Sequence, residues 1–175
     1  MVSNRPPECA PNQAHCLPAL AYIAAAQIHP PFLPHIPGMS GSPDPSQKFE
    51  IPSEFEQLEM VVDAAEAFYR ACFEDEEKIF TGVLLASEAV TNAIEHGNAH
   101  DASKRVFIEF TRDGGRVECW VEDEGEGFDR EAIADPLASE NLLEDGGRGI
   151  FLIERLADQV RYEKGGRRIG FIMSA

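Results

Sequence analysis

The chain has 175 residues, 43% apolar and 26% charged, which fits one globular domain with a substantial core. Acidic residues outnumber basic ones by 31 to 15, so the formal net charge is −16. This composition lacks the clustered Lys and Arg that follow a phosphate backbone, so we expect no direct binding to nucleic acid. The longest apolar stretch, residues 16–28, is too short to span a membrane. The four cysteines lack zinc-binding spacing and fit reduced thiols in a cytoplasmic protein.

The first 47 residues differ in composition from the rest of the chain. Ten of the 12 prolines precede Phe49, and the four charges of residues 1–48 cancel. Because proline removes backbone donors and interrupts helices and strands, we expect residues 1–47 to be a disordered N-terminal extension. Met39 stands in a sequence that reads like a natural start, so the residues before it could be a misassigned upstream extension. The folded domain is expected over residues 48–175.

The first half of this domain predicts one strand and two helices. Residues 49–51 form a short apolar run before a proline, which is typical of an edge strand. The segment 53–56 has the spacing of a capping box and predicts a helix that continues to about residue 71. A second helix is expected over 76–95, with Gly97 ending it.

The second half predicts two hairpins and one helix. In chain order we expect strands at 106–111 and 117–122, a helix at 150–157, and strands at 159–162 and 168–173. Glycine pairs between the strands favour tight turns. The polar stretch 124–147 shows little periodicity beyond a possible helical turn at 130–134. The elements together predict an α+β two-layer sandwich, with a mixed, mostly antiparallel sheet and helices on one face.

Three polar residues of the second expected helix form one stripe. Glu88, Asn92 and His96 are spaced i, i+4 and i+8, while Val83, Val90 and Ile94 lie on another face that can supply the core. A solvated helix face explains this stripe in the simplest way. The functional alternative is a metal and nucleotide site, because an Asn oxygen suits Mg²⁺ and a neighbouring carboxylate suits proton transfer.

A second group of candidates ends the strand at 117–122. Asp123 is followed by Gly125 and Gly127, so a carboxylate lies beside backbone that can turn sharply or approach a ligand closely. A buried Asp can accept a hydrogen bond from an exocyclic amine such as that of adenine. A plain acidic turn is the alternative interpretation.

A third group precedes the helix at 150–157. Gly146, Gly147, Arg148 and Gly149 would place free backbone N–H groups at a helix start, where the helix dipole favours phosphate. Arg148 could add a charge-assisted contact. The run is not a Walker loop or a dinucleotide fingerprint. The alternative is a flexible hinge at the end of a loop.

The order of the three motifs resembles the GHKL ATP-binding superfamily of histidine kinases, gyrase and Hsp90-type proteins. The box from Ser87 to Gly97, SEAVTNAIEHG, and the run from Gly146 to Glu154, GGRGIFLIE, are most similar to bacterial anti-sigma factors with serine kinase activity. The resemblance covers about residues 49–175 and implies a Bergerat-type ATP-binding fold. The proline-rich extension and a lid rich in acidic residues depart from the family pattern.

The resemblance also implies roles for the candidate residues. Asn92 would coordinate Mg²⁺, Asp123 would bind the adenine amino group, and Glu88 would be the general base. The glycines of the second and third motifs, Arg148 and His96 would complete the ATP site, and residues 128–145 would form a mobile lid.

The favoured function is therefore an ATP-dependent serine/threonine protein kinase that acts as an anti-sigma factor. Its implied partners are an anti-anti-sigma protein, which it phosphorylates, and a sigma factor, which it sequesters, usually as a homodimer. The alternative is a non-catalytic, nucleotide-gated partner-binding module. A detached histidine-kinase domain is disfavoured because the proline-rich first 47 residues offer no dimerisation helix with a phosphoacceptor His.

Overall fold

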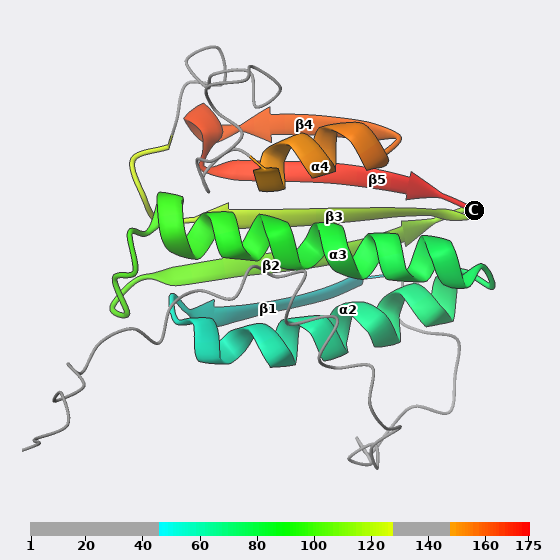
Figure 1. Ribbon diagram of the computed structural model, residues 1–175, viewed down its shortest axis with the longest axis horizontal. Coiled ribbons are helices and arrows are strands. Elements are labelled where there is room, and N and C mark those ends of the chain that lie inside the picture. Colours follow the sequence, from blue (N-terminus) through cyan, green and yellow to red (C-terminus); the bar gives the residue numbers. More distant parts are fainter. Residues whose placement is uncertain (1–45, 128–147) are drawn as a thin grey trace, which may run out of the picture. The chain divides into compact units, whose positions relative to one another are not determined.

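A computed structural model describes residues 46–127 and 148–175 of the chain. Its sheet has five strands in the order β1-β2-β3-β5-β4, and every pairing is antiparallel (Figure 1). In chain order the strands are β1 (Ser46–Pro52), β2 (Arg105–Asp113), β3 (Arg116–Asp123), β4 (Gln159–Glu163) and β5 (Arg168–Ser174). The last strand in the chain, β5, thus lies between β3 and β4 and pairs with both.

Within the described residues, three α-helices cover one face of this sheet (Figure 1). They are α2 (Leu58–Cys72), α3 (Glu76–Asn92) and α4 (Arg148–Leu156). The short turns are η1 (Phe55–Gln57), a π-helical turn η2 (Ala93–Gly97) that continues α3, and η4 (Lys164–Gly166). No helix among the described residues is both long and apolar enough to cross a membrane.

The predicted fold class is confirmed, with one refinement. The sheet is antiparallel throughout rather than mixed. The strand before Pro52 is an edge strand as expected, and the expected hairpins form at Gly114–Gly115 and near Gly165, where the glycines adopt positive φ. The expected extension 1–47, apart from its last two residues, and the possible helical turn at 130–134 lie outside the described residues.

The predicted capping box at the start of the first helix is wrong. Glu54, not Ser53, precedes the first helical turn, and no side chain caps it. Ser53 is buried, its N–H donates to the Lys104 carbonyl at 3.1 Å, and its hydroxyl has no partner among the described residues. After β1, the chain is therefore held at Ser53 by the residue before β2, and it enters α2 through the 3-10 turn η1. A true cap is present on α3, where the Asp75 carboxylate accepts from the Glu77 N–H at 2.9 Å.

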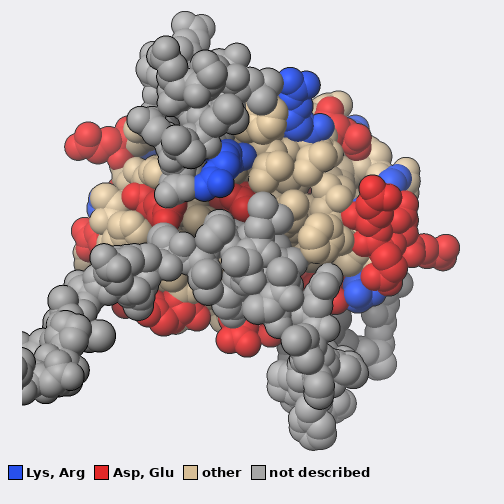
Figure 2. Space-filling view, in the orientation of Figure 1, with Lys and Arg blue, Asp and Glu red and all other residues tan. Residues whose placement is uncertain are grey.

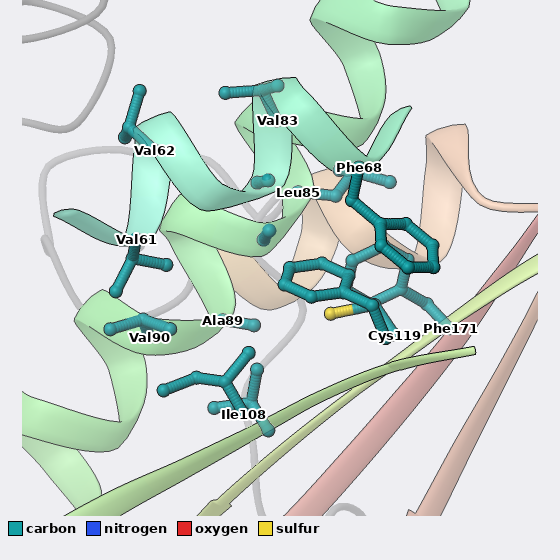
Figure 3. Close-up of a cluster of buried hydrophobic side chains, with 14 of the residues drawn as sticks. Val61, Val62, Phe68, Val83, Leu85, Ala89, Val90, Ile108, Cys119 and Phe171 are labelled. Carbon is teal, nitrogen blue, oxygen red and sulfur yellow. The ribbon is translucent and has the colours of Figure 1, made fainter. Parts of the chain in front are cut away.

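The core lies between the helices and the sheet. Apolar side chains of α2 and α3 meet those of the central strands (Figure 3). The labelled members are Val61, Val62, Phe68, Val83, Leu85, Ala89, Val90, Ile108, Cys119 and Phe171. Each large aliphatic or aromatic side chain removed from water contributes about 1.5–3 kcal/mol. This burial fixes α3 over the middle of the sheet and so orients its polar stripe.

Aromatic rings dominate the packing between α2 and the sheet. Phe68 stacks on Phe110 at 5.3 Å between ring centroids, and Tyr69 meets Phe110 edge-on at 5.9 Å. A Cβ at Gly82 would lie 2.6 Å from the Tyr69 ring, so α3 approaches α2 closely only because this residue is glycine. The Tyr69 hydroxyl is fully buried and has no partner among the described residues.

Candidate functional site

The polar stripe of α3 lies beside the start of α4. Val83, Val90 and Ile94 are buried in the core, as predicted, while Glu88 and Asn92 are only half-buried. The two polar side chains are one helical turn apart, so they share a face of the helix. The apolar face of α3 therefore directs this carboxylate and this amide away from the core.

Gly149 brings α4 against both of these side chains. A Cβ at Gly149 would lie 2.7 Å from Asn92 Nδ2 and 2.8 Å from Glu88 Oε2. Ordinary contacts of a Cβ begin at 3.4 Å, so no larger residue fits without displacing these groups. The missing side chain at Gly149 thus lets the first turn of α4 touch the stripe. Arg148 and Gly149 are the first residues of this helix, whereas Gly146 and Gly147 lie outside the described residues.

The electrostatic setting of Glu88 is that of a partly desolvated carboxylate. Burial raises its pKa above the ordinary value of 4.5, Arg148 acts in the opposite direction, and Glu95 raises it further. A carboxyl group with a raised pKa is a better proton acceptor than a fully solvated one. Arg148 keeps the ionised form accessible by its positive charge.

Asn92 has an amide group suited to a ligand. Its Nδ2 atom is buried and has no hydrogen-bond partner among the described residues. Such a buried, unsatisfied amide is costly unless something binds to it or the amide turns its oxygen to a ligand. The described residues contain no group of three or more His, Cys, Asp or Glu side chains placed so that they could hold a metal ion. A Mg²⁺ ion here would therefore take one protein oxygen and fill its other positions with phosphate and water, which is its usual habit. The residues present fit this ion.

His96 is separated from the pair on α3. It lies in the π-helical turn η2, its side chain is exposed, and its Nε2 atom lies 3.8 Å from the neighbouring Glu95 carboxylate. Because a π turn takes up one more residue than an α turn, the i+8 spacing no longer holds His96 on the α-helical stripe. Its membership in the nucleotide site stays a prediction.

Asp123 forms the other half of the candidate site. It ends β3, is only 8% exposed, and accepts the Gly125 N–H on Oδ1 at 2.8 Å. Burial raises its pKa above the ordinary 3.8, while the Gly125 bond and Arg167 oppose the rise. Its own N–H donates to the Arg167 carbonyl at 2.9 Å. The Gly125 bond uses Oδ1 and leaves the second carboxylate oxygen, Oδ2, out of this contact.

The glycines after Asp123 are required by close backbone packing. A Cβ at Gly125 would overlap the carbonyl of Gly97, and one at Gly127 would overlap the carbonyl of Gly165. Gly127 also has φ +82°, which favours glycine. The motif therefore serves as a tight turn in this fold, and the same turn presents the Asp123 carboxylate.

Gly97 links the two halves of the site. It is the last residue of η2, and a Cβ there would overlap the Asp123 carboxyl group. The π turn that follows Asn92 therefore leads directly to Asp123. Sequence reasoning had treated this glycine only as a helix stop. It had missed the buried Asn98 that follows, although an Asn next to a helix-ending glycine is a recognisable cap signal.

Comparison with known proteins gives the family. The chain matches the family described as Histidine kinase-like ATPase domain over residues 51–173, and it belongs to this family. Membership implies ATP binding.

Curated relatives are similar over part of their length. The serine-protein kinase RsbW of Bacillus subtilis (strain 168) is 35% identical over 86 residues, which cover 46% of this chain and 54% of that protein. RsbW of Staphylococcus epidermidis is 37% identical over 99 residues, covering 51% and 61% respectively. The anti-sigma F factor of Priestia megaterium is 38% identical over 82 residues, covering 45% and 56%. The chain thus spans little more than half the length of the curated relatives it matches.

A solved structure supports the fold. The RsbU and RsbW domains of a Mycobacterium tuberculosis protein match with a TM-score of 0.52 and 20% identity, over 75% of this chain and 32% of that one. This likeness, together with the antiparallel sheet and its helical layer, identifies an RsbW-like ATPase architecture.

Proposed function

We propose that this chain is an ATP-dependent serine/threonine protein kinase that acts as an anti-sigma factor. The observation that carries the proposal is the contact of Gly149 with both Glu88 and Asn92. This contact places a half-buried carboxylate and an amide that could hold a metal beside the start of α4. Similarity to proteins named serine-protein kinase and anti-sigma factor supports the same assignment.

In this proposal Asn92 binds the metal ion and Asp123 binds the adenine ring of ATP. Mg²⁺, when bound, neutralises charge on the phosphates. The Asn92 amide would present its oxygen to the ion. The Asp123 carboxylate accepts the adenine amino group on Oδ2, since its Oδ1 already accepts from Gly125.

The remaining candidates would surround the nucleotide. The N-terminus of α4, which begins at Arg148, offers backbone N–H groups and the positive end of a helix dipole. Arg148 adds a cationic side chain to the same place. We assign Gly125, Gly127, Gly146, Gly147, Gly149 and His96 to the same nucleotide site.

Glu88 acts as the general base. It accepts the proton of the attacking serine or threonine hydroxyl as the oxygen bonds to the γ-phosphorus and the bond to ADP breaks. Its raised pKa suits this step, and the positive charge of Arg148 opposes the rise and favours the ionised form. The contact with α4 holds Glu88 beside Asn92 while the hydroxyl approaches.

The proposed partners are an anti-anti-sigma protein, which is phosphorylated, and a sigma factor, which is sequestered by a homodimer of this chain in the cytoplasm. Acidic side chains gather on the helical face where α3 begins (Figure 2), and Glu74, Asp75, Glu76 and Glu77 are exposed there. This surface favours a partner with basic patches.

Phosphorylation of candidate anti-anti-sigma proteins with labelled ATP and Mg²⁺ tests the proposal. Wild type should label serine or threonine, and Glu88→Gln should lower transfer by roughly 10²-fold or more while keeping ATP and sigma binding. Glu59→Gln removes an exposed carboxylate from α2, outside that acidic surface, and should leave transfer unchanged. A wild type that labels nothing but binds a sigma factor would be the nucleotide-gated binding module instead. Full activity in Glu88→Gln would remove Glu88 from the chemistry.

A further inference from the structure

We propose that Asn98 is a positioning residue that sets the selectivity of the nucleotide site for adenine. This inference rests on the proposed function, because it concerns how Asp123 is aimed. Asn98 is fully buried, although asparagine is usually exposed. It follows Gly97 directly and lies between the end of α3 and the sheet.

Asn98 closes a ring of hydrogen bonds with two other residues. Its Nδ2 donates to the Arg105 carbonyl at 2.9 Å, and its Oδ1 accepts the Glu124 N–H at 2.9 Å. The Arg105 N–H in turn donates to Glu124 Oε2 at 2.7 Å. The ring joins the first residue of β2 to the residue that follows β3.

The ring also fixes the segment that leaves α3. The Asn98 N–H donates to the Ala93 carbonyl at 2.8 Å, and its carbonyl accepts the Asp101 N–H at 3.1 Å. All hydrogen-bonding groups of Asn98 except one amide hydrogen and spare lone pairs are thus in use. Only a side chain that carries both a donor and an acceptor at this length makes both contacts.

The Asp123 carboxylate lies inside this framework. Glu124, which Asn98 holds, stands between Asp123 and Gly125 in the turn. Gly97, which Asn98 follows, packs on the Asp123 carboxyl group, and the Gly97 carbonyl packs on Gly125. Asn98 therefore fixes both backbone segments that pack around the Asp123 carboxylate, namely Gly97 and the turn at Glu124 and Gly125. If the Asn98 hydrogen bonds to Arg105 and Glu124 are lost, the Asp123 carboxylate gains room to rotate. Its Oδ2 oxygen is then no longer held in one position to accept the adenine amino group.

Nucleotide discrimination tests this inference in the full chain. The probes are ATP, purine riboside triphosphate, which lacks the amino group, and inorganic triphosphate, which lacks the base. Wild type should bind ATP about tenfold or more tightly than the purine analogue, the factor that one hydrogen bond to a charged group provides. Asn98→Ala should reduce that ratio to about twofold and leave affinity for inorganic triphosphate unchanged for the folded fraction. A purely structural role would lower binding of all three ligands together and leave the ratio intact.

A second pair of variants keeps the test decisive if Asn98→Ala does not fold. Glu124 is exposed, so Glu124→Ala should fold while losing the bond to the Arg105 N–H. Its discrimination ratio should fall, and Glu124→Gln, which keeps an acceptor oxygen, should restore it. The exposed Ala102→Ser is the matched control and should keep the wild-type ratio. If the ratio of ATP affinity to purine-analogue affinity is unchanged in the folded variants, the role of Asn98 is overturned, but the proposed adenine contact of Asp123 is not. No discrimination in wild type would overturn the adenine contact of Asp123, and the inference with it.

Discussion

Replacing Gly149 with alanine tests the contact between α4 and the polar stripe of α3. The new Cβ would lie 2.7 Å from Asn92 Nδ2, so reaching the 3.4 Å of ordinary contact requires a shift of about 0.7 Å. The Glu88 carboxylate, at 2.8 Å, must also move. Both obstructing groups are the ends of side chains, and Gly149 has no positive φ, so the backbone can accept alanine. The structure therefore predicts displaced side chains within an intact fold.

The expected cost falls on catalysis rather than on stability. Misplacing reacting groups by about 1 Å lowers rates by about 10²-fold, so a shift somewhat below this should cost roughly tenfold or more in phosphoryl transfer. Alanine is a better helix former than glycine by about 0.5–1 kcal/mol, which offsets part of the steric strain in α4. The assay compares phosphorylation of the anti-anti-sigma substrate with the melting temperature of the same preparation. A folded Gly149→Ala that transfers phosphate at the wild-type rate would refute the argument.

Three further predictions follow from other contacts. Tyr69→Phe removes a buried hydroxyl without a described partner and should raise the free energy of unfolding by about 1 kcal/mol, measured by urea denaturation; a loss of stability would show that the hydroxyl is paired. Arg148→Gln removes a charge that lowers the pKa of Glu88, so the rising limb of the pH–rate profile should move to higher pH, because the base works only when ionised. An unmoved limb would separate Arg148 from Glu88. Asn92→Ala should stay folded and bind Mg·ATP at least about tenfold more weakly by calorimetry, and equal affinity would exclude Asn92 as the metal ligand.

Local patterns predicted most of the secondary structure of the described residues. Alternation along β2 and β3 and the glycines at their turn carry the information within a few residues, and the structure follows them. The capping box failed because Ser53 has the right spacing but is drawn toward Lys104 on the sheet side. Spacing along the chain does not report such a tertiary hydrogen bond. The π-helical turn after Asn92 could not be predicted either, because the spacing argument assumes a regular α-helix throughout.

For the candidate site, sequence spacing predicted the shared face of Glu88 and Asn92, since i, i+4 neighbours on a helix must lie together. It did not predict that Gly149 would meet both of them, because this contact joins segments more than 50 residues apart. The burial of Asn98 was missed for the same reason: its partners are supplied by the ends of β2 and β3. Both Gly149 and Asn98 make their contacts with residues that are distant in the sequence, so local spacing does not predict them.

The place of β5 in the sheet has a consequence for biosynthesis. Of the described elements, β5 leaves the ribosome last, yet it pairs between β3 and β4. Until residues 168–174 emerge, β3 has an unpaired edge, and β4 lacks the strand that attaches it to the sheet. The nascent chain also lacks a seat for α4, which the Tyr162 hydroxyl of β4 holds through Glu154 at 2.9 Å. An exposed strand edge is prone to pair with other chains. Pairing of β5 therefore covers the exposed edge of β3 and attaches β4, which contacts α4, to the sheet.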